Sequence, residues 1–236
     1  MKKYTHLFFD LDKTLWDFEA NSLETFRELY KEFSLRMYFP DFFTFHREFK
    51  EINEDLWEKY RQGEISKEDL NFKRFYLTLS RYNCDDISFS QQIADYYIIK
   101  SPLKNKLFPG TIETLKVLHG KYKMYVLTNG FSEVQFVKME HSGLTGFFER
   151  VFTSEEVGVH KPHPEFFNYV LSELEVVPDK CLMIGDDFTT DIIGAKDCGI
   201  DQVFFNPTII KVADQATYEI RKISEIKEIL LSLRYQ

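Results

Sequence analysis

Beyond residue 100, short apolar runs alternate with amphipathic stretches along the chain. This alternation is typical of a parallel β-sheet whose faces are covered by helices. The apolar runs predict five strands, at residues 5–9, 123–127, 150–153, 180–184 and 201–205. We therefore expect an α/β fold with a doubly wound parallel sheet.

Helix signals fall between these runs. Ser132 and Gln135 have the spacing of a capping box, which predicts that a helix begins there. The apolar positions of this helix are Val134, Val137 and Met139. Pro164 suits the first turn of another helix. Gly199 suits the residue that follows a helix over about 190–198.

Residues 18–100 show a different period. Apolar residues recur there at helical spacing, and no strand pattern interrupts them. They are Phe26, Leu29, Tyr30 and Phe33, followed by Phe45, Phe49, Ile52, Leu56 and Tyr60. The simplest topology places one strand before this block and the others after it, so the block is an all-helical insertion. We expect one domain made of residues 1–17 and 101–236, and a second made of residues 18–100.

Composition excludes several classes of protein. With 236 residues, 44% of them hydrophobic, the chain can bury a sizeable core. No segment reaches the roughly 20 apolar residues of a membrane span. A formal net charge of −8 argues against binding to nucleic acid. The three cysteines have no C-x-x-C spacing, so we expect reduced thiols in a cytoplasmic protein.

The first predicted strand ends in two acids, Asp10 and Asp12. Residues two apart in an extended chain point to the same side, so both carboxylates face one small space. At a separation of about 4 Å and an effective dielectric near 20, their repulsion is roughly 4 kcal/mol. A positive group must therefore lie nearby, or one acid must be protonated.

Three later loops also carry groups suited to a phosphate or a metal. Thr128-Asn129-Gly130 follows the second strand, Lys161-Pro162 the third, and Gly185-Asp186-Asp187 the fourth, with Asp191 further on. Ligands of open α/β sheets bind beyond the carboxyl ends of the strands, so these loops are expected to converge. Each loop alone has an ordinary explanation as a turn or helix start. Their matching placement after successive strands favours a site.

In order and placement, these loops resemble the four motifs of the haloacid dehalogenase-like hydrolases. The matching stretches are Asp10-Leu11-Asp12-Lys13-Thr14, Thr128-Asn129, Lys161-Pro162 and Gly185-Asp186 through Asp191. The similarity covers essentially the whole chain, and residues 18–100 resemble the helical cap of C1 type that these enzymes insert after the first motif. The resemblance implies a Rossmann-like catalytic core with an inserted all-helical cap.

Three stretches are similar to the pyrimidine 5′-nucleotidase branch of that superfamily. They are Leu56-Trp57-Glu58-Lys59-Tyr60-Arg61-Gln62-Gly63, Thr128-Asn129-Gly130-Phe131-Ser132 and Ser154-Glu155-Glu156-Val157-Gly158-Val159. This similarity implies a phosphatase for nucleoside 5′-monophosphates, with broad specificity. The expected partner is a small phosphate monoester. A phosphatase for sugar phosphates or phosphoglycolate is the alternative.

The resemblance also implies the roles of the site residues. Asp10 is the nucleophile that forms an aspartyl-phosphate. Asp12 protonates the leaving alcohol and then takes a proton from the attacking water. Lys161 neutralises Asp10 and the phosphate. The expected phosphate ligands are Thr128, Asn129, Gly130 and Lys161, and the expected substrate contacts on the cap are Trp57 and Tyr60. Core packing is the alternative for these two aromatic residues.

A divalent cation is implied because the candidate acids outnumber the ammonium of Lys161. Oxygen-only coordination favours Mg²⁺. The candidate ligands are Asp10, Asp12, Asp186, Asp187 and Asp191. In the family the contacts come from the side chains matching Asp10 and Asp186 and from the backbone carbonyl matching Asp12. Asp187 stands where many relatives carry Ser or Thr, so the sequence leaves open whether Asp187 or Asp191 supports the metal.

Other functions share part of this pattern. Asp12-Lys13-Thr14 resembles the phosphorylation loop of cation-pumping ATPases, but Leu15 replaces the expected glycine. A dehalogenase needs neither the metal nor Asp12. A phosphomutase has the metal and Asp12 as well, but its product is an isomerised phosphate ester instead of free phosphate. A non-catalytic binding protein is expected to have lost at least one of Asp10, Asp12, Lys161 or Asp186. The oligomeric state stays open.

Overall fold

The computed structural model describes residues 4–212 and 214–232. They form two compact units: the core unit, Met1–Phe18 with Asn105–Gln236, and the helical unit, Glu19–Lys104. The units divide after Phe18 and after Lys104, whereas the sequence pattern placed the boundaries after residues 17 and 100. The outer ends of the expected core segments, residues 1–3 and 233–236, lie outside the described residues.

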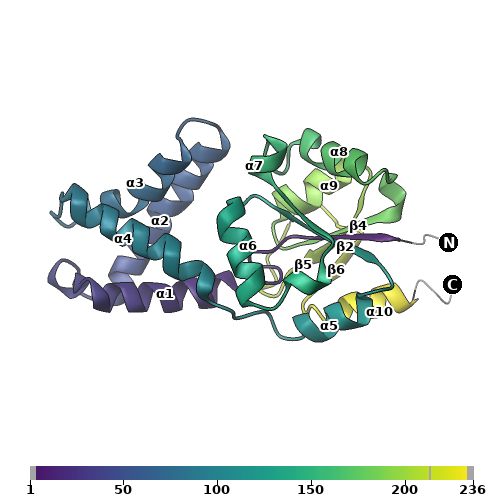
Figure 1. Ribbon diagram of the computed structural model, residues 1–236, viewed down its shortest axis with the longest axis horizontal. Helices are drawn as coiled ribbons and strands as arrows, with labels where there is room; N and C mark the ends of the chain where they lie inside the picture. Colours follow the sequence, from purple (N-terminus) through teal and green to yellow (C-terminus); the bar gives the residue numbers. More distant parts are fainter. Residues whose placement is uncertain (1–3, 213, 233–236) are drawn as a thin grey trace. The chain divides into compact units, whose positions relative to one another are not determined.

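A six-stranded parallel sheet forms the centre of the core unit, in the order β3-β2-β1-β4-β5-β6 (Figure 1). The strands are β1 (His6–Phe9), β2 (Lys123–Thr128), β3 (Arg150–Thr153), β4 (Cys181–Gly185), β5 (Asp201–Phe205) and β6 (Tyr218–Ile220). The five strands predicted from the apolar runs are confirmed to within one residue. β6 was not predicted because it is short and only its last residue is buried, so it has no apolar run.

Helices cover both faces of this sheet, as the alternating pattern predicted (Figure 1). The longer ones are α5 (Thr111–Leu118), α6 (Ser132–His141), α8 (Pro164–Glu173) and α10 (Glu225–Ser232). The short ones are α7 (Ser154–Val157), α9 (Gly194–Asp197), the single turns η3 (Thr145–Phe147) and η4 (Pro178–Lys180), and the π-helical η5 (Phe188–Ile193). The predicted helix starts near Ser132 and at Pro164 are confirmed. Gly199 follows α9 with a φ of 75°, which fits the predicted helix end.

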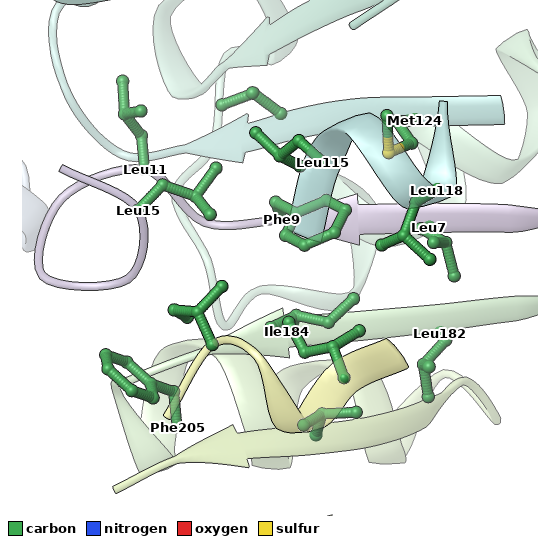
Figure 2. Packing of buried hydrophobic residues seen from close by; sticks show 14 of the residues in the cluster. Leu7, Phe9, Leu11, Leu15, Leu115, Leu118, Met124, Leu182, Ile184 and Phe205 are labelled. Carbon is green, nitrogen blue, oxygen red and sulfur yellow. The ribbon is translucent and has the colours of Figure 1, made fainter. Parts of the chain in front are cut away.

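Alternate residues of β1 contact opposite layers of helices. Leu7 and Phe9 belong to a cluster that includes Leu115 of α5 (Figure 2). Phe8 belongs to a second cluster, which includes Phe166 of α8. All three β1 residues are fully buried. Burial on both faces explains why the central strands appear in the sequence as continuous apolar runs.

The first turn of α6 differs from its prediction. Phe131 occupies the cap position and makes no side-chain hydrogen bond to the helix, whereas the Ser132 N–H donates to Glu155 Oε2 at 2.7 Å. The hydroxyl of Ser132 contacts that of Thr153 at 2.8 Å, and the side chain of Gln135 contacts site residues instead of the helix start. The predicted capping box is therefore wrong. Of the helix residues, Gln135, Lys138 and Met139 are buried, whereas Val134 and Val137 are only half-buried.

Residues 19–104 form no strand, and the structure describes all of them. The helices of this part are α1 (Phe18–Glu32), α2 (Phe42–Arg61), α3 (Lys67–Ser80) and α4 (Ile87–Lys100), with the single turns η1 (Leu35–Met37) and η2 (Ser101–Leu103). Phe26 lies at their centre, with its ring centroid 4.5 Å from that of Phe49 and 5.0 Å from that of Tyr97. The helical spacing of aromatic residues thus predicted this core. None of the described helices combines the length and apolar character that crossing a membrane requires.

Candidate active site

Three neighbouring strands lead into the candidate site. β1 lies between β2 and β4, with Phe9 aligned with Val126 and Ile184. The loops after these parallel strands therefore begin at one edge of the sheet. Asp10 follows β1 directly, and its backbone N–H donates to the carbonyl of Ile184 at 2.9 Å. The first acid is thus held at the middle of that edge.

Lys161 is a buried ammonium that connects β2 with the segments that follow β1 and β4. Its Nζ donates to Asp10 Oδ1 at 2.8 Å, to Asp191 Oδ1 at 2.6 Å and to the carbonyl of Leu127 at 2.7 Å. The side chain is only 1% exposed. Because an ammonium has three donors, these contacts use them all. Lys161 therefore has a single well-defined orientation toward Asp10.

Asn129 holds the backbone of Lys161 in place. Its Nδ2 donates to the Lys161 carbonyl at 2.9 Å, and its Oδ1 accepts from the Lys161 N–H at 2.8 Å. The two hydrogen bonds tie the loop after β2 to the segment that carries the lysine. The side-chain amide of Asn129 is thus committed to Lys161, so the phosphate contact expected of Asn129 would come from its backbone N–H.

Thr128 ends β2 and is 1% exposed. Its Oγ1 accepts hydrogen bonds from the Gly130 N–H at 3.1 Å and from Gln135 Nε2 at 2.6 Å. Both contacts use the oxygen as acceptor, so neither commits the hydroxyl proton. Gly130 must lack a side chain because a Cβ there would collide with the amide of Gln135.

Carboxylate oxygens of Asp10, Asp186 and Asp191 lie within 4.8 Å of one another. Thr14 donates to Asp186 Oδ1 at 3.0 Å, which orients that carboxylate. A Cβ at Gly185 would collide with the side chain of Asp191, so the close approach of Asp191 depends on this glycine. The three acids come from the loops after β1 and β4, which are adjacent strands.

Two other predicted acids lie outside this cluster. Asp187 is exposed, and its Oδ1 accepts from the backbone N–H groups of Thr189 and Thr190 at 2.9 and 2.8 Å. It therefore acts as the N-cap of η5. Asp12 is half-buried, and its carboxylate contacts α6 instead of the cluster. The geometry groups Asp191, and not Asp187, with Asp10 and Asp186.

The pKa values of the clustered acids reflect their burial and mutual repulsion. Burial raises the pKa of Asp10 to about 7, although the Lys161 charge opposes the shift. Burial, with the charges of Asp10 and Asp191, raises the pKa of Asp186 to about 8. Burial also raises the pKa of Asp191, against the effect of Lys161. Burial would lower the pKa of Lys161, but the charges of Asp10 and Asp191 raise it above its ordinary value.

The acids of this cluster outnumber the positive charges beside them. Three carboxylates within 4.8 Å face one ammonium, and burial raises the pKa values of Asp10 and Asp186. A divalent cation among the carboxylates would supply the missing charge and favour their ionised forms. The donors are all oxygen atoms, which suits Mg²⁺. The residues present therefore fit a magnesium site.

Asp12 is bound by two side chains of α6. Lys138 Nζ donates to both carboxylate oxygens, at 2.6 and 2.9 Å. Gln135 Nε2 donates to Asp12 Oδ2 at 2.9 Å. The repulsion expected between Asp10 and Asp12 is thus reduced by a separate ammonium for each acid, Lys161 for Asp10 and Lys138 for Asp12.

Sequence reasoning missed Gln135 and Lys138 as site residues. Polar residues on a helix are usually in contact with solvent, so nothing distinguished this pair locally. One signal was available: Phe131, Gln135, Lys138 and Met139 share a helical stripe, and its outer two members are apolar. Two polar residues within a stripe bounded by Phe131 and Met139 indicate a buried polar contact.

Trp57 and Tyr60 lie on α2 of the helical unit. Both are half-buried, and their ring centroids are 5.8 Å apart with perpendicular planes. Each ring therefore packs against the other and still exposes part of its surface. This arrangement is compatible with either of the roles considered for them, packing or substrate contact.

The chain matches the family model of haloacid dehalogenase-like hydrolases over residues 4–199. It is 31% identical to the HAD-hydrolase YfnB of Bacillus subtilis, with 98% of this chain and 97% of YfnB aligned. It is 31% identical to the pyrimidine 5′-nucleotidase YjjG of Escherichia coli, covering 86% and 87% of the two chains. It is 30% identical to the pyrimidine 5′-nucleotidase PynA of Streptococcus pneumoniae, covering 96% and 95%.

The structural comparison agrees with the sequence comparison. The crystal structure of Bacillus subtilis YfnB bound to magnesium superposes with a TM-score of 0.87 at 30% identity, over 98% of this chain and 100% of that one. A family match over most of the chain, a relative aligned along nearly its full length and the ordered motifs at one edge of the sheet agree. The chain belongs to the haloacid dehalogenase-like hydrolase family.

Proposed function

We propose that the protein is a Mg²⁺-dependent phosphomonoester hydrolase that acts through an aspartyl-phosphate, with nucleoside 5′-monophosphates as preferred substrates. The observation that carries the proposal is the buried contact of 2.8 Å between Lys161 Nζ and Asp10 Oδ1, beside the three-carboxylate cluster. An ammonium and a cation around one carboxylate suit attack on a phosphate, because they reduce the repulsion between two anions.

The side chains of Asp10 and Asp186 and the backbone carbonyl of Asp12 would hold the metal, as the family resemblance implies. Asp191 supports it as the second acid of the last motif, since it lies in the cluster and Asp187 caps η5. When bound, Mg²⁺ supplies positive charge that favours ionised carboxylates and orients the phosphate.

Asp10 acts as the nucleophile. Its carboxylate oxygen bonds to phosphorus while the ester oxygen leaves, so one difficult hydrolysis becomes two easier steps. Lys161 neutralises Asp10, and its charge reduces the repulsion between Asp10 and the phosphate. The uncommitted proton of the Thr128 hydroxyl donates to another phosphate oxygen, since the two contacts of Oγ1 use it as an acceptor.

Asp12 acts as the general acid and base. It protonates the leaving oxygen in the first step and takes a proton from water in the second. Its side chain is 26% exposed, whereas that of Asp10 is 11% exposed. Greater exposure suits a group that exchanges protons with the leaving alcohol and with water.

The proposed substrate class rests on the nucleotidase relatives and on Trp57 and Tyr60 of the helical unit. Stacking on an aromatic ring contributes about 1–3 kcal/mol per base and tolerates different bases. Strong rejection of a base needs dedicated hydrogen-bonding groups, and the sequence motifs point to none. We therefore propose broad activity over pyrimidine and deoxy nucleotides.

The test is phosphate release from a panel of nucleoside, sugar and small organic monophosphates, with Mg²⁺ present. Asp10→Asn serves as the inactive control. We expect the highest kcat/KM with pyrimidine nucleoside 5′-monophosphates. A preference for sugar or two-carbon acid phosphates would overturn the nucleotidase assignment. Isomerised phosphate esters in place of free phosphate would assign a mutase.

Trapping with beryllium fluoride tests the nucleophile. The adduct is expected on Asp10, because Asp10 contacts the Lys161 ammonium and Asp12 does not. An adduct on Asp12 would instead support the ATPase-like alternative. The adducted residue can be located by crystallography.

A further inference from the structure

Helix α6 binds the Asp12 carboxylate with two side chains one turn apart. Gln135 and Lys138 are three residues apart, so both point to the same side of the helix. Together they make three hydrogen bonds to Asp12, two from Lys138 Nζ at 2.6 and 2.9 Å and one from Gln135 Nε2 at 2.9 Å. Both carboxylate oxygens of Asp12 are therefore held, and rotation of the carboxyl group is restricted.

The ammonium of Lys138 is itself fixed. Lys138 is 5% exposed, and its Nζ lies 4.5 Å from the ring centroid of Trp16 and 5.9 Å from that of Phe18. An ammonium near aromatic faces is attracted by the ring electrons, more strongly where water is excluded. Burying a lysine is costly unless its charge is compensated. Here Asp12 and Trp16 compensate it.

Gln135 connects Asp12 to the phosphate-binding loop. The same Nε2 that donates to Asp12 also donates to Thr128 Oγ1, at 2.6 Å. Gln135 is fully buried, and none of the residues that the structure describes offers its Oε1 a hydrogen-bond partner. Gly130 leaves the space that its amide fills. Burying a side-chain amide is costly, so a residue with a purely structural role at this position would be better apolar.

We propose that Lys138 and Gln135 are positioning residues that hold the Asp12 carboxyl at the angle needed to give its proton to the leaving oxygen. The inference rests on the proposed phosphatase function and adds two residues to it. In the step concerned, an Asp10 oxygen bonds to phosphorus and the bond from phosphorus to the ester oxygen breaks. The electron pair stays on the ester oxygen, and a proton that Asp12 has taken up from water moves to it from Oδ1, the oxygen that accepts only one of the three hydrogen bonds.

A leaving-group series distinguishes positioning from a merely structural role. Departure of an alkoxide requires a well-placed acid, whereas p-nitrophenolate leaves without one. Lys138→Met removes the ammonium and keeps an apolar side chain of similar length. Lys116→Met is the matched control, because Lys116 is an exposed lysine on α5. kcat/KM is suited to this test because it reports the steps up to departure of the leaving group.

We expect Lys138→Met to lower kcat/KM about 100-fold for alkyl phosphates and less than about 5-fold for p-nitrophenyl phosphate, since positioned acids contribute about 10²–10⁴-fold. Lys138→Arg should retain more activity toward alkyl phosphates than Lys138→Met does. Lys116→Met should have the wild-type kcat/KM for both types of ester. Equal losses of Lys138→Met on both esters would overturn the inference.

Gln135→Leu provides a second test if Lys138→Met does not fold. It removes the hydrogen bonds of Nε2 to Asp12 and to Thr128 Oγ1, and we expect a larger loss for esters with poor leaving groups than for p-nitrophenyl phosphate. A uniform loss would again overturn the inference. Wild-type protein that releases phosphate from no ester would instead contradict the proposed function itself, so the two failures are distinguishable.

Discussion

The ammonium of Lys161 lies 2.6 Å from the carboxylate of Asp191, and each of these side chains is 1% exposed. The same ammonium lies 2.8 Å from Asp10. Removing one partner of a buried ion pair typically costs about 3–5 kcal/mol, because the remaining charge stays desolvated. Asp191 therefore holds Lys161 in the orientation that directs it toward Asp10.

We expect Asp191→Asn to lower kcat about 10–100-fold and to raise the Mg²⁺ concentration needed for activity, since groups that orient metal ligands contribute about this much. Asp187→Asn is the matched variant. Asparagine caps helices as well as aspartate does, so its activity should stay within about twofold of the wild type. Magnesium titrations of phosphate release measure both. A larger loss of kcat in Asp187→Asn than in Asp191→Asn would assign the supporting acid to Asp187.

Gly185→Ala should reduce both stability and activity, because its Cβ would collide with the carboxylate of Asp191. We expect a loss of about 1–3 kcal/mol in the free energy of unfolding, as for overpacked sites, together with impaired magnesium dependence. Gly146→Ala is the control, since no atom lies within 4 Å of a Cβ at that position. Denaturant unfolding and phosphate release would show the difference. Similar stability and activity of the Gly185→Ala and Gly146→Ala variants would contradict the close approach of Asp191 to Gly185.

Magnesium should be required for activity and should stabilise the fold more at high pH. The pKa of Asp10 is raised from 3.8 to about 7 and that of Asp186 to about 8, chiefly by burial. The metal-free folded chain therefore binds more protons than the unfolded chain between about pH 4 and pH 8, and its stability falls as pH rises through this window. Magnesium binds the ionised acids of the folded state and offsets that loss.

Thermal unfolding with and without millimolar Mg²⁺ checks this expectation. The increase in Tm should be larger at about pH 8.5 than at about pH 5.5, because protons compete with the metal at lower pH. Asp186→Asn should reduce the difference between the two pH values. Two results would argue against the assigned metal site. One is an equal increase in wild-type Tm with Mg²⁺ at the two pH values, and the other is full phosphatase activity after exhaustive chelation.

Trp57→Ala should lower kcat/KM for nucleoside monophosphates about 5–100-fold more than for a small generic phosphate ester, if the ring stacks on a base with about 1–3 kcal/mol. Phe43→Ala is the control, because Phe43 is a 71% exposed aromatic residue on the same helix, α2. Equal losses of Trp57→Ala on both substrate types would mean that Trp57 only packs against Tyr60 and its neighbours.

Local pattern was enough to predict five of the six strands and the helical insertion. The central strands are buried on both faces, so they appear as apolar runs, and the parallel order places their loops at one edge. Asp10, Thr128, Lys161 and Asp186 could be selected because each ends a strand or lies in the segment after one. Strand burial and motif order are properties that the sequence records locally.

The partners within the site were not available from local pattern. Whether Asp191 or Asp187 joins the acidic cluster depends on the direction of each side chain around the turn of η5, and both lie on the same short segment. The contacts of Asn129 with the Lys161 backbone likewise depend on how two loops meet. Such contacts join residues far apart in the sequence, and spacing does not encode them.

Helix α6 is the clearest example of a local pattern that predicts an element but not the contacts of its side chains. The spacing of Ser132 and Gln135 predicted a helix start, and a helix does begin there. The role of Gln135 was mistaken, because a capping box and a buried polar stripe use the same residue types. Only the packing of α6 against the loop after β1 brings Gln135 and Lys138 to Asp12, 123 and 126 residues away along the chain. Burial then turns two ordinary helix residues into the partners of a carboxylate.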